Sequence, residues 1–167
     1  MLLRSTAITA WALLACGGAL AEECRLDQAN YREARSGATI EFRAKDPTTD
    51  AAATVVLLEM RLPNLAEVYP GDVTWNAGSN TRPDGWIRRQ CTPLDTENGL
   101  DSCQLWDGNI FGLANGTADI LADADKAAPP AILLNNFGRA LYWSVAFEGA
   151  NPTVGGFDVF TLTGCRS

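Results

Sequence analysis

Short runs in which apolar and polar residues alternate recur along this chain, and clusters of turn residues separate them. The clearest run covers residues 54–62, whose apolar positions would share one face: Val56, Leu58, Met60 and Leu62. Residues 39–44 repeat the pattern, with Ile40 and Phe42 on one face. Apolar residues at every second position are typical of a half-buried β-strand, whereas apolar residues on one face of a helix recur about every 3.6 residues. The alternation therefore predicts a fold built mainly from short strands.

Further strand-like runs lie between clusters of Gly, Pro, Asn and Asp, at residues 73–75, 86–91, 103–106, 110–113, 131–134, 139–147 and 156–163. With the two runs above, they give about eight or nine strands. No internal repeat or linker divides them. The sequence thus predicts one all-β domain over residues 22–167, an antiparallel β-sandwich or small barrel of about 8 strands with at most one short helix.

Three local features refine this expectation. Asn115-Gly116 is the strongest hairpin signal in the chain. Residues 119–128 are rich in Ala and Asp and stop before two prolines, so the one short helix is expected there. In the run 139–147, Trp143 alternates with other apolar residues and is expected to point into the core.

The first 21 residues have the order of a cleaved secretory signal. One early charge, Arg4, precedes an apolar run at residues 7–15, and small residues follow, ending with Ala19-Leu20-Ala21. The apolar run is too short to span a bilayer, which takes about 20 helical residues. We therefore expect a periplasmic or secreted protein of bacterial type, with no membrane span.

A second interpretation of the same segment starts from residues 13–16, Leu-Leu-Ala-Cys, which resemble a bacterial lipobox. Cys16 would then carry a lipid anchor. Leu14 is bulky for that site, and the Ala-x-Ala cleavage site lies only a few residues on. The cleaved signal is therefore the favoured interpretation.

Four cysteines remain once the signal is removed, and an even number in an exported chain indicates disulfides. They are Cys24, Cys91, Cys103 and Cys165, which allow three connectivities. The nested pairing is our prediction: Cys24 with Cys165, which closes almost the whole domain, and Cys91 with Cys103. A zinc site is disfavoured because the chain has no Cys-x-x-Cys spacing and no histidine.

Charge and composition exclude several functions. The chain has 13 basic and 20 acidic residues, and a net charge of -7, whereas nucleic-acid binding needs a positive surface. Without histidine there is no Ser-His-Asp or Cys-His catalytic group. Three aspartates, Asp119, Asp123 and Asp125, lack the calcium-loop pattern and are interpreted as residues of the expected helix start. No metal and no cofactor is expected.

A polar loop between two tryptophans is the best candidate for a binding site. Aromatic rings beside amide and charged groups are typical of glycan and protein recognition. The predicted binding residues are Trp75, Asn76, Asn80, Arg82, Asp84 and Trp86. The alternative is structural, with the two rings in contact across a hairpin and the polar residues forming its turn.

One short stretch resembles a known family. Ser36-Gly37 is similar to the Ser-Gly of the SGxxY motif of bacterial periplasmic lysozyme inhibitors, which are also small, acidic, disulfide-bonded β proteins. The tyrosine position of that motif is Ile40 here. The resemblance implies an inhibitory function, and no site residue is carried over from it.

The sequence therefore predicts an exported, non-catalytic binding or interaction protein with a protein or glycan ligand. One alternative is an inhibitor of a basic secreted enzyme such as lysozyme, which the acidic charge would favour. The other is a carboxylate-dependent polysaccharide hydrolase, because a glycosidase needs only two suitably spaced carboxylates.

Overall fold

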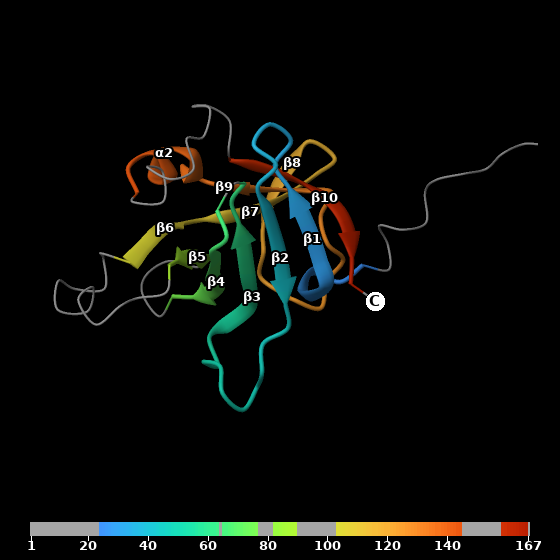
Figure 1. Cartoon of the computed structure of the whole chain (residues 1–167). Helices are drawn as coiled ribbons and strands as arrows, with labels where there is room; N and C mark the ends of the chain where they lie inside the picture. The colour runs from blue at the N-terminus through green and yellow to red at the C-terminus, as the bar shows by residue number, and fades with distance from the viewer. Residues whose placement is uncertain (1–23, 64, 77–81, 90–102, 145–157, 167) are drawn as a thin grey trace, which may run out of the picture.

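The computed structural model describes residues 24–63, 65–76, 82–89, 103–144 and 158–166. Within them, ten strands form one antiparallel sheet, and one short α-helix and one 3-10 helix accompany it (Figure 1). The helices are η1 (Leu26–Gln28) and α2 (Phe137–Tyr142). The strands are β1 (Ala29–Arg32), β2 (Thr39–Arg43), β3 (Thr54–Arg61), β4 (Val68–Trp75), β5 (Pro83–Arg88), β6 (Gln104–Gly108), β7 (Ile110–Ala114), β8 (Thr117–Ile120), β9 (Ala131–Leu134) and β10 (Val159–Cys165). The predicted all-β class is confirmed.

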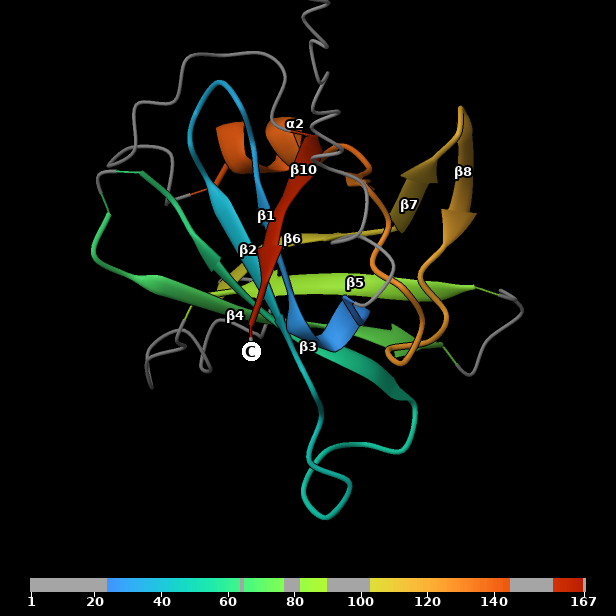
Figure 2. The ribbon, with the colours of Figure 1, turned by 90° about the vertical axis from the view of Figure 1, so that its right-hand side faces the viewer.

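The sheet is strongly curled, in the form of a half-barrel. Its strand order is β6-β5-β4-β3-β2-β1-β10-β9-β7-β8, so the first six strands form a meander. Figure 2 shows β4 and β5 running across the direction of β1, β2 and β10. Only Asn109 separates β6, at one edge, from β7, next to the other edge. The curl therefore brings the two edges of the sheet toward each other.

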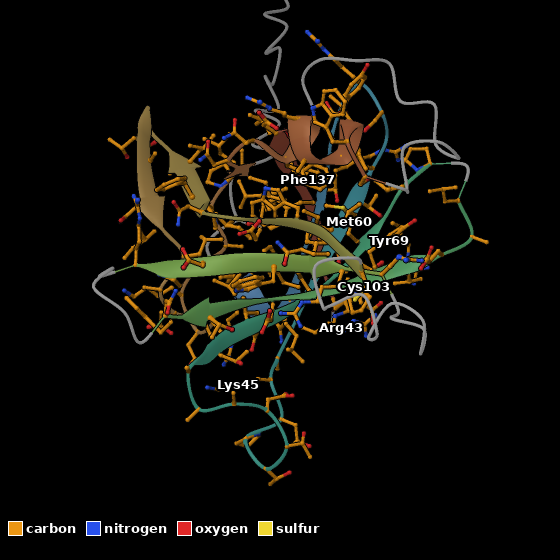
Figure 3. The ribbon with its side chains drawn as sticks, turned by 90° about the vertical axis from the view of Figure 1, so that its left-hand side faces the viewer. Arg43, Lys45, Met60, Tyr69, Cys103 and Phe137 are labelled. Atoms are coloured by element: carbon orange, nitrogen blue, oxygen red, sulfur yellow. A yellow bond between two sulfur atoms is a disulfide. The ribbon has the colours of Figure 1, made fainter. Side chains whose placement is uncertain are left out.

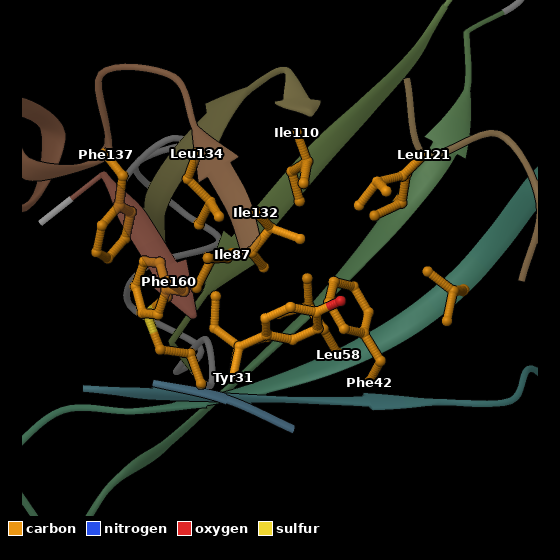
Figure 4. Close-up of a cluster of buried hydrophobic side chains, with 14 of the residues drawn as sticks. Tyr31, Phe42, Leu58, Ile87, Ile110, Leu121, Ile132, Leu134, Phe137 and Phe160 are labelled. Carbon is orange, nitrogen blue, oxygen red and sulfur yellow. The ribbon is translucent and has the colours of Figure 1, made fainter. Parts of the chain in front are cut away.

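The hydrophobic core fills the inside of this curl (Figure 4). In β3, the predicted apolar positions Val56, Leu58 and Met60 are all buried, as the period of two required. Tyr31 in β1 is also fully buried, and its hydroxyl donates a hydrogen bond of 2.9 Å to the carbonyl oxygen of Pro129. Burial raises the pKa of Tyr31.

Helix α2 covers one part of the core from the side of β6. Its buried residues Phe137 and Leu141 are four positions apart and so share one helix face. Phe137 meets the fully buried Trp106 edge-to-face, with the ring centroids 6.1 Å apart. Trp106 Nε1 also donates a hydrogen bond of 2.9 Å to the carbonyl oxygen of Asn135. This contact joins β6 to the turn before α2.

The predicted strand at residues 139–147 is wrong over its described part. Residues 139–142 belong to α2, and Trp143 directly after it is 76% exposed instead of buried. Residues 145–147 lie outside the described residues. Leu141 fits a period of two with Trp143, but it also fits the helical spacing with Phe137, and the helical spacing is the one that buries both side chains.

The predicted helix at residues 119–128 is also wrong. Residues 119 and 120 end β8, and the segment after them runs along the N-terminal residues instead. Three backbone hydrogen bonds hold it there: Leu26 N–H to Lys126 O, Asp27 N–H to Ala124 O and Ala128 N–H to Cys24 O. These long-range bonds take up the backbone groups that a local helix would have used.

The predicted hairpin at Asn115-Gly116 is confirmed. Both residues have positive φ, 52° and 77°, as a two-residue turn between β7 and β8 requires. Strand β1 was not predicted from the sequence. Its four residues alternate between buried and more exposed positions, but the run is too short to stand out. Its pairing with β2 is regular, whereas its pairing with β10 is irregular between Asn30 and Tyr31.

A disulfide joins Cys24 to Cys165 across 141 residues, with the Cα atoms 5.8 Å apart. It links the residues next to the central strand pair β1 and β10, and it confirms this half of the nested prediction. Cys103 is buried and disulfide-bonded. Its predicted partner Cys91 lies outside the described residues, so the second pairing stays a prediction.

Candidate functional site

The two tryptophans of the predicted binding loop lie on opposite faces of the sheet. Trp75 is paired with Pro83, whereas Trp86 is paired with Asp72. Residues paired across an antiparallel ladder share a face, and successive residues alternate between faces. Pro83 shares its face with the buried Ile87. Trp75 is therefore on the inner face and Trp86 on the outer face, so the alternative of a direct contact between the two rings is wrong.

Trp86 lies half-buried on the outer face of β4, β5 and β6. Asp72 in β4 and Asp107 in β6 are its direct cross-strand neighbours, and the Cβ atoms of such pairs are about 5 Å apart. Asp84 and Arg88 lie two residues before and after it in β5, on the same face. We call these five residues the Trp86 patch.

The carboxylates of this patch are partly fixed by neighbouring side chains. Asn76 Nδ2 donates a hydrogen bond of 3.2 Å to Oδ2 of Asp84, and Asn109 Nδ2 donates one of 2.7 Å to Oδ1. Thr74 Oγ1 donates a hydrogen bond of 2.9 Å to Asp72. Two of the three carboxylates are thus held in position before any ligand arrives.

Arg88 lies against the ring of Trp86. Its guanidinium carbon is 5.4 Å from the ring centroid, within the range of a cation–π contact. Arg88 is itself exposed. The contact fixes the guanidinium beside the ring and keeps its N–H donors at the surface.

The charges of the patch are less balanced than those on the neighbouring strands. On the outer face of β2 and β3, Arg43 forms ion pairs with Glu59 at 2.8 Å and with Glu41 at 3.3 Å. No ion pair involves Asp72, Asp84 or Asp107 in the part of the chain that the structure describes. Three carboxylates therefore surround one tryptophan and one arginine, and the patch carries excess negative charge.

Trp75 lines a pocket of about 390 Å³ at the end of the sheet where the β2–β3 loop begins. The pocket lies between that loop, the N-terminal segment and residues 122–125. Figure 3 shows Lys45 at the base of the loop, which projects from the body of the protein. We call this cavity the Trp75 pocket. Its aromatic and charged lining residues are Arg25, Asp27, Lys45, Trp75, Asp123 and Asp125.

Three of the six residues predicted to bind a ligand come together on the outer face: Asn76, Asp84 and Trp86. Trp75 lies on the other face, Arg82 is exposed just before β5, and Asn80 lies outside the described residues.

Sequence reasoning missed Asp72, Arg88 and Asp107 as neighbours of Trp86, and Asn109 as a hydrogen-bond partner of Asp84. The expected strands at residues 73–75 and 103–106 each stop one residue short of Asp72 and Asp107, although both are strand residues. The alternation within each strand could have assigned them to the outer face. Only the register between strands places them beside Trp86, and that register is not visible in the sequence.

The Ser36-Gly37 pair lies in the turn between β1 and β2, where Gly37 has a φ of 78°. The Ser36 hydroxyl donates a hydrogen bond of 2.6 Å to the buried carboxylate of Glu33 and accepts one of 3.1 Å from Ala38 N–H. The backbone N–H groups of Arg35 and Ser36 also donate to this carboxylate, at 3.0 and 2.5 Å. Ser36 therefore uses its hydroxyl within its own turn.

Replacing Glu33 by glutamine should destabilise the protein at neutral pH by about 1–3 kcal/mol, because the amide NH₂ would face N–H donors. Burial of the carboxyl group favours the protonated form, but the hydrogen bonds from Ser36 and Arg35 outweigh it and lower the pKa of Glu33. A lowered pKa stabilises the fold above the ordinary glutamate pKa, and this stabilisation is lost as the pH falls through the lowered value.

Urea unfolding of Glu33→Gln and the parent over a range of pH measures the effect. The difference between them should shrink toward acid pH. Asp107→Asn, at an exposed carboxylate that forms no ion pair among the described residues, is the control and should change little. A pH-independent difference for Glu33→Gln would contradict the proposed role of the charged carboxylate.

Comparison of the chain with protein-family models, with curated proteins and with solved structures finds no match. No helix in the described ranges is both long and apolar enough to cross a membrane. Among the described residues, no group of three or more Cys, Asp and Glu side chains is placed to hold a metal ion. The site is therefore defined by its own geometry, an aromatic and acidic surface on the outside of a curled antiparallel sheet.

Proposed function

We propose that this chain is an exported, non-catalytic interaction protein that binds a basic protein partner through the Trp86 patch. The observation that carries this proposal is the position of Trp86, half-buried on the outer face between the carboxylates of Asp72 and Asp107. Export is supported by the Cys24–Cys165 disulfide, because disulfides persist in oxidising compartments such as the periplasm.

The side chains of the patch are of the kinds that contribute most to protein interfaces. Tryptophan and arginine are enriched among residues whose truncation costs the most binding energy. Here the two are in contact, with the Arg88 guanidinium beside the Trp86 ring. Asp84 is held by Asn76 and Asn109, so little side-chain entropy is lost when a partner binds.

The charge of the patch favours a basic partner. Its three carboxylates have no ion pair with a cation of the described chain, and the whole protein has a net charge of -7. A lysine or arginine of a partner would complement these carboxylates and could lie against the indole. Such complementarity mainly raises the association rate and makes it dependent on salt.

Trp86→Ala tests the proposal directly. The protein and the variant would be immobilised and exposed to an envelope extract, and retained proteins would be quantified by mass spectrometry. We expect proteins of net positive charge on the parent and a loss of about 2 kcal/mol for the variant, roughly thirtyfold in affinity. Trp143→Ala, which also removes an exposed indole, is the matched control and should bind like the parent.

Two outcomes would overturn the proposal: retention of the same proteins by Trp86→Ala and the parent, or retention of acidic proteins alone. Circular dichroism of each variant confirms that it is folded. A second variant, Asp72→Asn with Asp107→Asn, should slow association at low salt more than at high salt, because salt screens the charges that it removes.

Inhibition of a basic secreted enzyme is the narrower form of this proposal, supported by the same three carboxylates, which form no ion pair among the described residues. An activity assay with purified lysozyme at low and moderate salt tests it. Inhibition that weakens with salt and with Trp86→Ala would identify this function, whereas full lysozyme activity would restrict the proposal to other basic partners.

A further inference from the structure

We propose that the Trp75 pocket binds a neutral carbohydrate of one or two sugar rings. This site is separate from the Trp86 patch, because Trp75 and Trp86 lie on opposite faces of the β4–β5 pair. The inference therefore does not depend on the proposed protein partner, and either one can hold without the other.

Trp75 provides an aromatic side of the pocket. Trp75 is one of the few large apolar residues in the described chain that stay exposed, at 38%. Its backbone N–H donates a hydrogen bond of 2.9 Å to Ala53 O, which fixes the end of β4 against the β2–β3 loop. Val55, itself buried, adds a second apolar side chain to the lining. An indole with an apolar neighbour is a surface on which the C–H face of a sugar ring can lie.

Two cationic side chains that line the pocket are held in place by hydrogen bonds. Lys45 Nζ donates hydrogen bonds to Thr54 O at 2.6 Å and Ala52 O at 3.2 Å. An ammonium group has three N–H donors, so one remains for a ligand. Arg25 is held by Asp27 through bonds of 3.1 and 2.7 Å, and these hydrogen bonds raise the pKa of Arg25. Both cations are thus oriented by the protein itself.

The lining of the pocket contains both hydrogen-bond donors and hydrogen-bond acceptors. Lys45 and Arg25 line the pocket together with three carboxylates, those of Asp27, Asp123 and Asp125, and Arg25 forms ion pairs with Asp27 and Asp125. A lining with both cations and carboxylates suits hydroxyl groups, because each hydroxyl can donate and accept. The slight excess of negative charge disfavours a phosphorylated ligand. The volume of about 390 Å³ lies within the range of small-molecule sites.

The pocket can be tested with a defined panel of probes: glucose, N-acetylglucosamine, maltose, cellobiose and glucose 6-phosphate. Binding to the full chain would be followed by tryptophan fluorescence and by isothermal titration calorimetry. We expect saturable binding of at least one neutral sugar in the millimolar range, and weaker binding of the phosphorylated sugar than of glucose.

Trp75→Ala should weaken this binding by about tenfold or more, because it removes the stacking surface. Trp75→Phe keeps a ring and should restore part of the affinity, which separates a loss of stacking from a loss of folding. Trp86→Ala and Trp143→Ala leave the pocket intact and should bind sugar like the parent.

The inference is wrong if no neutral sugar of the panel gives a saturable signal at millimolar concentrations. It is equally wrong if Trp75→Ala binds like the parent, or if glucose 6-phosphate binds more tightly than glucose. None of these results bears on the protein partner, whose binding is measured with Trp86→Ala.

Discussion

Replacing both Cys24 and Cys165 by serine should lower the free energy of unfolding by about 2–5 kcal/mol, because the bridge restricts the unfolded chain. The disulfide closes a loop of 141 residues, and a crosslink of that length removes about 5 kcal/mol of chain entropy from the unfolded state in the loop-closure model. It also joins the segment before β1 to the last residue of β10. Urea unfolding of the double variant and the parent, without reductant, measures the loss.

Cys91→Ser with Cys103→Ser is the comparison. The predicted bridge between these two residues closes a loop of about 13 residues, for which the same model gives about 3 kcal/mol. The long bridge should therefore matter more, and equal losses would show that loop length does not govern the effect. Mass mapping of a non-reduced digest should yield one peptide pair linking 24 to 165 and another linking 91 to 103; a cross pairing would refute the nested prediction.

Trp106→Ala should destabilise the protein by about 3–5 kcal/mol, because it empties the space of a large buried ring. Trp106 is 2% exposed and packs edge-to-face on Phe137. The ring also lies directly on the backbone of two glycines: a Cβ added to Gly85 or Gly108 would come within 2.9 Å of it. The variant would further leave Asn135 O without its indole donor.

Trp143→Ala is the control for this change, since the same side chain is removed from a site that is 76% exposed. Its effect should stay within about 0.5 kcal/mol, as for most surface substitutions. Thermal and urea unfolding of the two variants would be compared under identical conditions. A larger loss for Trp143→Ala than for Trp106→Ala would contradict both the core assignment and the placement of α2.

The parts of the fold that could be predicted are those that local chemistry determines. Strand β3 alternates without interruption, and the β7–β8 turn has Asn115 and Gly116 where positive φ is needed. In contrast, Pro70 and Gly71 lie within β4, although a Pro-Gly pair is typical of a turn. Gly71 is needed there for close packing, because an added Cβ would come within 2.1 Å of Trp86 O.

The elements that could not be predicted depend on contacts between distant segments. The composition of the acidic segment before Pro129 is typical of a helix. Its backbone groups instead form hydrogen bonds with residues 24–27. The sequence also does not show that Trp75 and Trp86 lie on different faces of the sheet. The ten residues between Trp75 and Trp86 suggested a single site, and the register of β4 with β5 shows two separate surfaces.

The pairing of β1 with β10 has a consequence for how this protein is made. The meander from β1 to β6 can assemble while the chain is still emerging, since each strand pairs with the one before it. The edge of β1 that does not pair with β2 nevertheless has no strand partner until β10 is available. Strand β10 also pairs with β9. A strand edge without a partner can pair with other chains and so promote aggregation. Strands that are far apart in the sequence also pair slowly. The export proposed above would therefore require protection of the chain against aggregation until its last strand arrives.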